Sequence, residues 1–157
     1  MNKLTDADKR QIIQTGIDIL GTKFNTRDAS IIMAAIAYQE SNFFHRKQII
    51  GPARGLWQFE MNGGVIGVLR HSSSAKLALE VCRIRKVEHT TKNVYDQLEH
   101  DDVLAAAFAR LLLWTDPKPI PSDPDSAWQY YLKIWRPGKP HPGRWKECWS
   151  NAVDLYK

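Results

Sequence analysis

The sequence contains little cysteine and no long apolar run. Its 157 residues include only two cysteines, Cys82 and Cys148, too few to define a disulfide framework, and we expect both to be reduced and buried as small hydrophobic residues. No run approaches the roughly 20 apolar residues of a membrane span, and the N-terminal segment lacks the basic-then-apolar layout of a secretory signal. We therefore expect no stable membrane insertion and no export by a signal peptide.

Motifs for several common chemistries are also missing. The five histidines form no short metal-ligand pair and the cysteines form no CxxC motif, so we predict neither a metal site nor a cofactor. Phosphate-binding glycine loops are absent, and the serines at 72–74 lie in no Gly-x-Ser-x-Gly setting. Lys and Arg exceed Asp and Glu by 22 to 17, which suits polyanionic partners in general. Without zinc-finger spacing or an aromatic RNA-binding motif, however, we expect no nucleic-acid partner.

What the sequence does contain is apolar periodicity typical of helices. Apolar residues make up 43% of the chain, enough for the core of one domain spanning residues 1–157. The first helix should follow a capping box formed by Thr5 and Asp8 and stop before Gly21. Further helices are predicted over residues 28–40, 74–87, 91–98, 102–114, 124–135 and 144–156. The predicted caps are Ser73 or Ser74 for the helix that ends at 87, Asp101 or Asp102 for the one that ends at 114, and Asp123 for the one that ends at 135. The fold class is therefore mainly α.

Residues 41–69 break this pattern with five glycines and one proline scattered among aromatic residues. We predict a loop-rich stretch with a small irregular or β-hairpin element. Two proline-rich segments, at 116–124 and 136–143, are short enough to be loops within one domain.

Glu40 is the most informative single residue. It closes a helix that is otherwise almost entirely apolar. Partial burial and the negative end of the helix macrodipole both disfavour a carboxylate there, so both should raise its pKa. A carboxylic acid that stays protonated near neutral pH is what glycosidic bond cleavage requires. The alternative is a helix-end glutamate that points into water or pairs with Arg46, Lys47 or Arg54.

The sequence around Glu40 resembles a known superfamily. AAIAYQESNF is followed, after a short insert, by GPARGLWQFE. Across residues 28–60 this is similar to lytic transglycosylases and goose-type lysozymes, in which a buried helix ends in a catalytic Glu-Ser pair and a Gly-Leu-Met-Gln segment lines the saccharide cleft. The WRPGKPHPGRW segment near the end is similar to lysozyme-like proteins of tailed phages.

The resemblance implies a lysozyme-like helical domain that binds peptidoglycan glycan strands and cleaves the β-1,4 bond between N-acetylmuramic acid and N-acetylglucosamine. Glu40 would be the acid, and Ser41, Gly55, Trp57 and Gln58 would shape the cleft. Glycine at 55 lets backbone approach a sugar, Gln58 can hydrogen-bond to hydroxyl or N-acetyl groups, and Trp57 can stack on a ring face. Trp57 is equally well explained as a core aromatic.

Two further positions have open roles. Glu60 stands where goose-type lysozymes carry an Asp, so it is either a second catalytic carboxylate that orients water or a surface glutamate, and hydrolase and lytic transglycosylase both remain open. The family's Ala-Tyr-Asn-Ala-Gly motif is not matched, because AAAFARLLLW places Phe108 there. Tyr130 and Tyr131 are alternatives for supporting Glu40, for contacting sugar, or for ordinary packing, and Tyr131 is the candidate substrate-binding residue.

Three other functions compete with this interpretation. The least favoured is a basic nucleic-acid-binding helical module, which strongly salt-dependent retention on DNA would reveal. A chitinase-like glycosidase would share the acid and the helical fold. A catalytically inactive structural or assembly protein of a phage virion would keep the fold alone. On the phage hypothesis, the protein is a monomer in a virion or in the host cytoplasm that acts at the cell wall, and other virion proteins are candidate partners.

Overall fold

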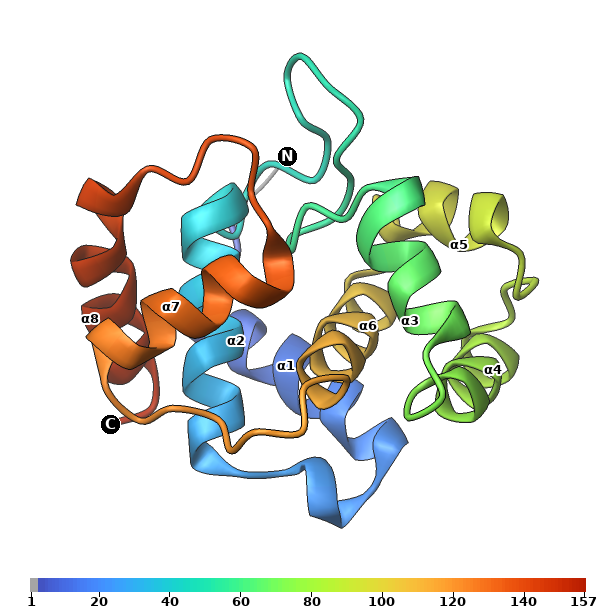
Figure 1. Ribbon diagram of the computed structural model, residues 1–157, viewed down its shortest axis with the longest axis horizontal. Helices are drawn as coiled ribbons and strands as arrows, with labels where there is room; N and C mark the ends of the chain where they lie inside the picture. The colour runs from blue at the N-terminus through green and yellow to red at the C-terminus, as the bar shows by residue number, and fades with distance from the viewer. Residues whose placement is uncertain (1–2) are drawn as a thin grey trace.

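Helices make up most of the chain, as the apolar periodicity predicts. The structure is a computed structural model that describes residues 3–157, and within that range it contains eight α-helices and no sheet (Figure 1). The mainly α class is therefore confirmed. The α-helices are α1 (Asp6–Leu20), α2 (Arg27–Ser41), α3 (Ile66–Arg70), α4 (Ala75–Arg85), α5 (Thr91–Leu98), α6 (Asp102–Trp114), α7 (Pro124–Trp135) and α8 (Trp145–Leu155), with short helical turns η1 (Thr22–Phe24), η2 (Met61–Val65) and η3 (Pro142–Arg144).

Local capping chemistry fixes most helix starts. The capping box of Thr5 and Asp8 is present, with the Asp8 backbone N–H 3.1 Å from Thr5 Oγ1 and the Thr5 N–H 2.9 Å from Asp8 Oδ2. The side chain of Asp123 caps α7 as predicted, and that of Asp101, one of the two predicted candidates, caps α6. Helix α2 begins one residue before its predicted start because Thr26 is its cap.

Helix α4 begins directly after Ser74, one of its two predicted caps, but ends earlier than predicted. It ends at Arg85, two residues short, because Lys86 adopts the left-handed conformation. Ser74 precedes the helix, but its hydroxyl donates to the carbonyl of Val68 at 2.7 Å instead of capping the new turn.

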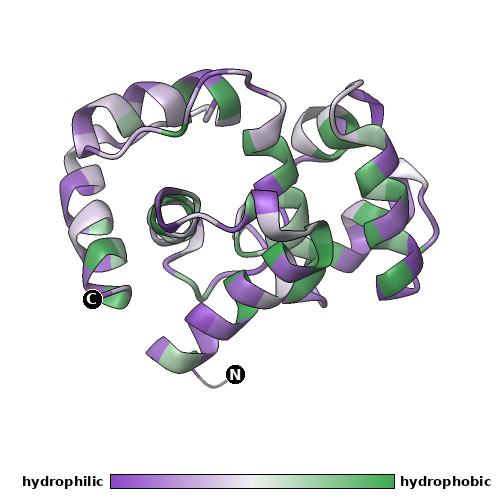
Figure 2. Ribbon diagram, turned by 90° about the horizontal axis from the view of Figure 1, so that it is seen from below, coloured by the Kyte–Doolittle hydropathy of each residue, from purple (hydrophilic) through white to green (hydrophobic). Residues whose placement is uncertain are grey.

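Helix α2 runs through the middle of the core. Every residue from 29 to 39 is buried, which explains its nearly unbroken apolar sequence. It packs against α8 on one side, while α1 packs against α6 (Figure 1). A Cβ at Gly16 would lie 2.7 Å from Ala106 Cβ, so glycine permits that close approach. Figure 2 shows α1, which begins beside the N label, banded in hydrophilic and hydrophobic colours as expected for an amphipathic helix.

The segment after α2 is irregular, and the hairpin alternative is wrong. Lys47 and Phe59 each form only an isolated bridge with Arg54, and no strand develops. The backbone takes positive φ at Gly55 and Gln58, which interrupts extended pairing. Residues 47–54 instead form a loop that projects from the helical body (Figure 1).

Both cysteines are free and buried, as predicted. Burial raises the pKa of the Cys82 thiol to about 11, so this group remains a neutral thiol. Within residues 3–157 no helix combines the length and the apolar character needed to cross a membrane.

Candidate functional site

Glu40 lies in the last turn of α2 and is mostly buried. Its chain neighbours Gln39 and Ser41 are buried as well. Burial raises the pKa of the Glu40 carboxyl to about 7, against the opposing effects of a hydrogen bond from Tyr131 and the charge of Arg144. The negative charge of Glu60 raises that pKa further. The balance leaves a carboxyl group that can hold or release a proton near neutral pH.

Tyr131 on α7 holds this carboxyl in place. Its hydroxyl donates a hydrogen bond to Glu40 Oε2. The phenol ring is 1% exposed and stacks on Trp145, with ring centroids 5.3 Å apart and planes 11° apart. Burial and the neighbouring Glu40 charge raise the pKa of Tyr131, so it remains a hydrogen-bond donor. The position of Tyr131 therefore agrees with the predicted role of supporting Glu40. Because the side chain is buried, it has no surface with which to contact a sugar.

Ser41 ties the end of α2 to the segment that follows it. The buried Ser41 hydroxyl donates to the carbonyl of Leu56 at 2.6 Å and lies 3.1 Å from that of Ala37. The predicted contact between Ser41 and the saccharide is therefore replaced by a structural one. This hydrogen bond joins Leu56 to the last turn of α2, although Ser41 itself is inaccessible.

Trp57 lies in the core and not in a cleft, which corrects its predicted stacking on a sugar ring. It is 1% exposed, and its indole N–H donates to the carbonyl of Met33 at 2.9 Å. Its own carbonyl accepts a hydrogen bond from the indole N–H of Trp135 at 3.0 Å. Trp57 is therefore a core aromatic residue, the second of the two explanations that the sequence allowed.

Glycine is required at position 55 because the backbone packs closely against another part of the protein. The sequence predicts a close approach to a sugar at this position, and this packing corrects it. Its φ is +79°, and a Cβ there would meet the Leu98 carbonyl oxygen at 3.0 Å. The backbone N–H of Gly55 donates to the carbonyl of Arg46 at 2.6 Å. These contacts seat the start of the Gly-Leu-Trp-Gln segment against the end of α5.

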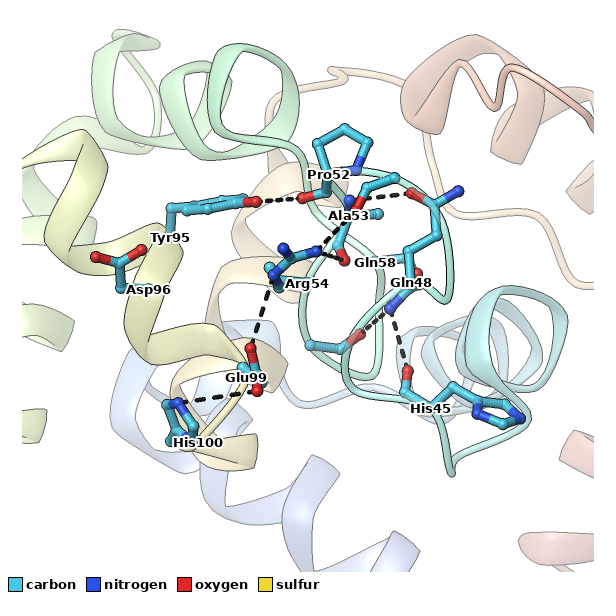
Figure 3. A network of polar contacts seen from close by, with 12 residues as sticks. His45, Gln48, Pro52, Ala53, Arg54, Gln58, Tyr95, Asp96, Glu99 and His100 are labelled. Carbon is cyan, nitrogen blue, oxygen red and sulfur yellow. Dashed lines mark hydrogen bonds and ion pairs between the residues drawn. The ribbon is translucent and has the colours of Figure 1, made fainter.

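Gln58 is half-buried and has a fixed amide. Its Nε2 donates to the carbonyls of His45 at 3.1 Å and Gly55 at 2.9 Å (Figure 3). Its φ is +52°, a left-handed conformation that these two hydrogen bonds help to hold. Both amide hydrogens are thus engaged within the protein, which leaves the amide oxygen as the group available to a ligand.

Helix α5 anchors the base of the projecting loop (Figure 3). Arg54 forms an ion pair with Glu99 at 3.7 Å, and the Tyr95 hydroxyl donates to the carbonyl of Pro52 at 2.5 Å. The backbone N–H of Ala53 donates to the Gln48 side chain at 3.1 Å. These contacts hold the loop that precedes Gln58 against α5.

A cleft of about 580 Å³ opens beside Gln58 and Glu60. Glu60 is exposed at this cleft, whereas Glu40 is not among the residues that line it. Trp135 connects the two, because it lines the cleft, packs against Tyr131 and donates to the Trp57 carbonyl. The other lining residues come from η2 and α3 with the residues next to them, from α6 and the connection after it, and from the end of α7: Phe59, Asn62, Gly63, Gly64, Gly67, His71, Leu112, Thr115, Asp116, Pro117, Lys133, Ile134 and Arg136.

Trp135 was missed from the sequence as a cleft residue. It is half-buried, so part of its ring is free to contact a ligand. The available signal was its position as the last residue of α7, directly before the Arg-Pro-Gly turn.

No group of three or more His, Cys, Asp or Glu side chains suited to a metal ion occurs in the part of the chain that the structure describes. Comparison with protein-family models, with curated protein sequences and with solved structures finds no match. The roles of the site residues are therefore argued from their own geometry and chemistry.

Proposed function

We propose that this protein is a peptidoglycan-degrading enzyme with a lysozyme-like fold, in which Glu40 is the general acid. The observation that supports this best is the state of Glu40, a mostly buried carboxyl whose pKa is raised to about 7 and whose position is fixed by Tyr131. An acid that protonates a glycosidic oxygen must carry its proton at the pH of the reaction. The bond cleaved is the β-1,4 linkage between N-acetylmuramic acid and N-acetylglucosamine.

The first step transfers the Glu40 proton to the leaving glycosidic oxygen while the bond from that oxygen to the sugar C1 breaks. Positive charge develops on the sugar, and Glu40 becomes a carboxylate. The Tyr131 hydroxyl and the Arg144 charge both favour that ionised form, since both lower the pKa of Glu40. They therefore stabilise the state that proton transfer creates.

The second step returns a proton to Glu40. In a hydrolase, water attacks C1, gives up its proton and leaves a reducing end. In a lytic transglycosylase, the substrate's own 6-hydroxyl attacks and leaves an anhydro end. Glu60 is the candidate for orienting water, because it is exposed at the cleft and its charge acts on Glu40.

The cleft supplies groups suited to a saccharide. Its volume of about 580 Å³ falls in the ordinary range for ligand sites. The half-buried Trp135 ring offers a face for a sugar, and the Gln58 oxygen offers an acceptor for a hydroxyl or N-acetyl group. The protein would act at the wall from a phage virion or from the host cytoplasm.

The test is digestion of purified peptidoglycan sacculi by the wild-type protein, with chitin oligosaccharides as the second substrate and released products identified by mass. Muropeptides with reducing ends identify a hydrolase, and anhydro ends identify a lytic transglycosylase. Cleavage of chitin alone would replace the proposal with a chitinase-like activity. Cleavage of neither substrate would overturn the enzymatic proposal in favour of a structural virion protein.

A further inference from the structure

Arg110 on α6 is a buried charge without a counter-charge. Arg110 is 3% exposed, and its Nε donates to the carbonyl of Phe24 at 3.0 Å. The guanidinium carbon lies 5.4 Å from the Phe24 ring centroid and 5.9 Å from that of Trp114. Among residues 3–157 no Asp or Glu forms an ion pair with it. Buried charges are ordinarily paired, so this guanidinium is unusual.

The Arg110 side chain lines a cavity of about 780 Å³ near the start of α2, at the opposite end of that helix from Glu40. The cavity walls include the apolar or aromatic side chains of Trp114, Ile120 and Tyr130. Lys23 lies at the same cavity, with its Nζ 5.2 Å from the Trp114 ring centroid. Apolar walls and a convergent pair of cations are characteristic of sites for amphipathic anions.

The acidic residues at this cavity have other roles. The carboxylate of Asp116 pairs with Lys133 at 2.8 Å and accepts the backbone N–H of Lys118 at 2.8 Å. Asp28 is exposed in the first turn of α2, where a negative charge favours the helix dipole. Neither carboxylate neutralises Arg110.

We propose that this cavity is a second binding site for a small carboxylate with an aromatic or aliphatic body. The cavity adjoins the cleft at Gln58, because both are lined by His71, Thr115, Asp116 and Pro117, but only this cavity contains Arg110 and Lys23. The two Nη groups of Arg110 can receive the carboxylate side by side, as guanidinium and carboxylate commonly pair. Trp114, Ile120 and Tyr130 would contact the apolar body, and Lys23 would add charge at the rim. Burial lowers the pKa of Arg110, and a bound carboxylate would offset this by restoring a counter-charge.

The site is tested by calorimetric titration with 3-phenylpropionate and with octanoate, each compared with its neutral amide. We expect saturable one-to-one binding of the acids and affinity about tenfold weaker for the amides, the loss typical of removing a charged hydrogen-bond partner. Arg110→Met should abolish the preference for the acid, and Lys23→Met should reduce it. Arg83→Met is the matched control, because Arg83 is exposed on α4 and pairs with Glu80.

A second measurement covers the case in which Arg110→Met does not fold. The indole N–H resonance of Trp114 in the wild-type protein should shift on adding 3-phenylpropionate, with that of Trp135 in the cleft unchanged. Equal affinity for acid and amide, no saturable binding of either acid, or a shift confined to Trp135 would each overturn the proposal. None of these outcomes depends on peptidoglycan cleavage.

Discussion

The Tyr131 hydroxyl donates a hydrogen bond to Glu40 Oε2, joining α7 to the end of α2 across 91 positions of sequence. This hydrogen bond and burial act on the Glu40 pKa in opposite directions. Burial favours the neutral acid, whereas the donated hydrogen bond favours the carboxylate, and the outcome is a Glu40 pKa of about 7. The proton affinity of the proposed acid is thus set by two helices that meet only in the folded protein.

Tyr131→Phe should move the pH dependence of peptidoglycan cleavage upward. Without the hydroxyl, the carboxylate of Glu40 loses a stabilising donor and the Glu40 pKa rises. Because the reaction needs protonated Glu40, the alkaline fall in activity should shift to higher pH. Tyr130→Phe is the matched control, since that hydroxyl donates to the Leu113 carbonyl instead. A pH–rate profile unchanged by Tyr131→Phe would contradict the assigned role.

Glu60→Gln should shift the same profile in the opposite direction. The charge of Glu60 raises the pKa of Glu40, so its removal lowers that pKa and moves the alkaline fall to lower pH. If Glu60 also orients water, the maximal rate of a hydrolase should fall as well. An upward shift of the profile, measured on the same sacculi, would show that the two carboxyl groups do not interact as described.

Stability should depend on pH through Glu40. Its folded pKa is raised from 4.5 to about 7, so the folded state binds a proton that the unfolded state has already released between those values. This favourable contribution is complete below pH 4.5 and is lost as pH rises through 7. The difference corresponds to about 3 kcal/mol in the free energy of unfolding.

Glu40→Gln removes that dependence. Its stability advantage over the wild type should therefore grow by about 3 kcal/mol between pH 4 and pH 8, as measured by urea unfolding at each pH. Glu88→Gln, an exposed glutamate, serves as the control substitution. An advantage for Glu40→Gln that stays constant with pH would argue against a raised pKa.

Gly55→Ala should destabilise the fold by about 1–3 kcal/mol. The substitution forces alanine into a φ of +79° and brings its Cβ to 3.0 Å from the Leu98 carbonyl oxygen. Gly138→Ala is a matched control, because a Cβ there meets nothing within 4 Å. Equal urea midpoints for the two variants would show that the close approach to α5 is not strained.

The helices could be predicted because their signals are local. The Thr5 and Asp8 capping box and the Asp123 cap each act within three residues, and apolar periodicity reports burial one turn at a time. Glu40 could be singled out for the same reason, since an acidic residue after an apolar helix is visible in the sequence itself. Its place in the structure, mostly buried at the end of α2, agrees with that expectation.

The arrangement of the aromatic residues could not be predicted, because their partners are distant in sequence. Trp57 adjoins Gln58 and so was expected at the cleft, but its indole N–H finds the Met33 carbonyl, 24 residues away. Trp135 lines the cleft instead, and it reaches Trp57 across 78 residues. The spacing of residues along the sequence does not show which of the two tryptophans is buried in the folded protein.

The most direct test of the central claim is the rate of muropeptide release from purified sacculi by the wild type and by Glu40→Gln, measured side by side at pH 6. The glutamine variant keeps an acceptor for Tyr131 but cannot donate an acidic proton, so we expect a folded protein whose release rate falls at least about a hundredfold, the lower end of typical general-acid contributions. A folded Glu40→Gln protein that releases muropeptides at the wild-type rate would contradict the assignment of Glu40 as the acid.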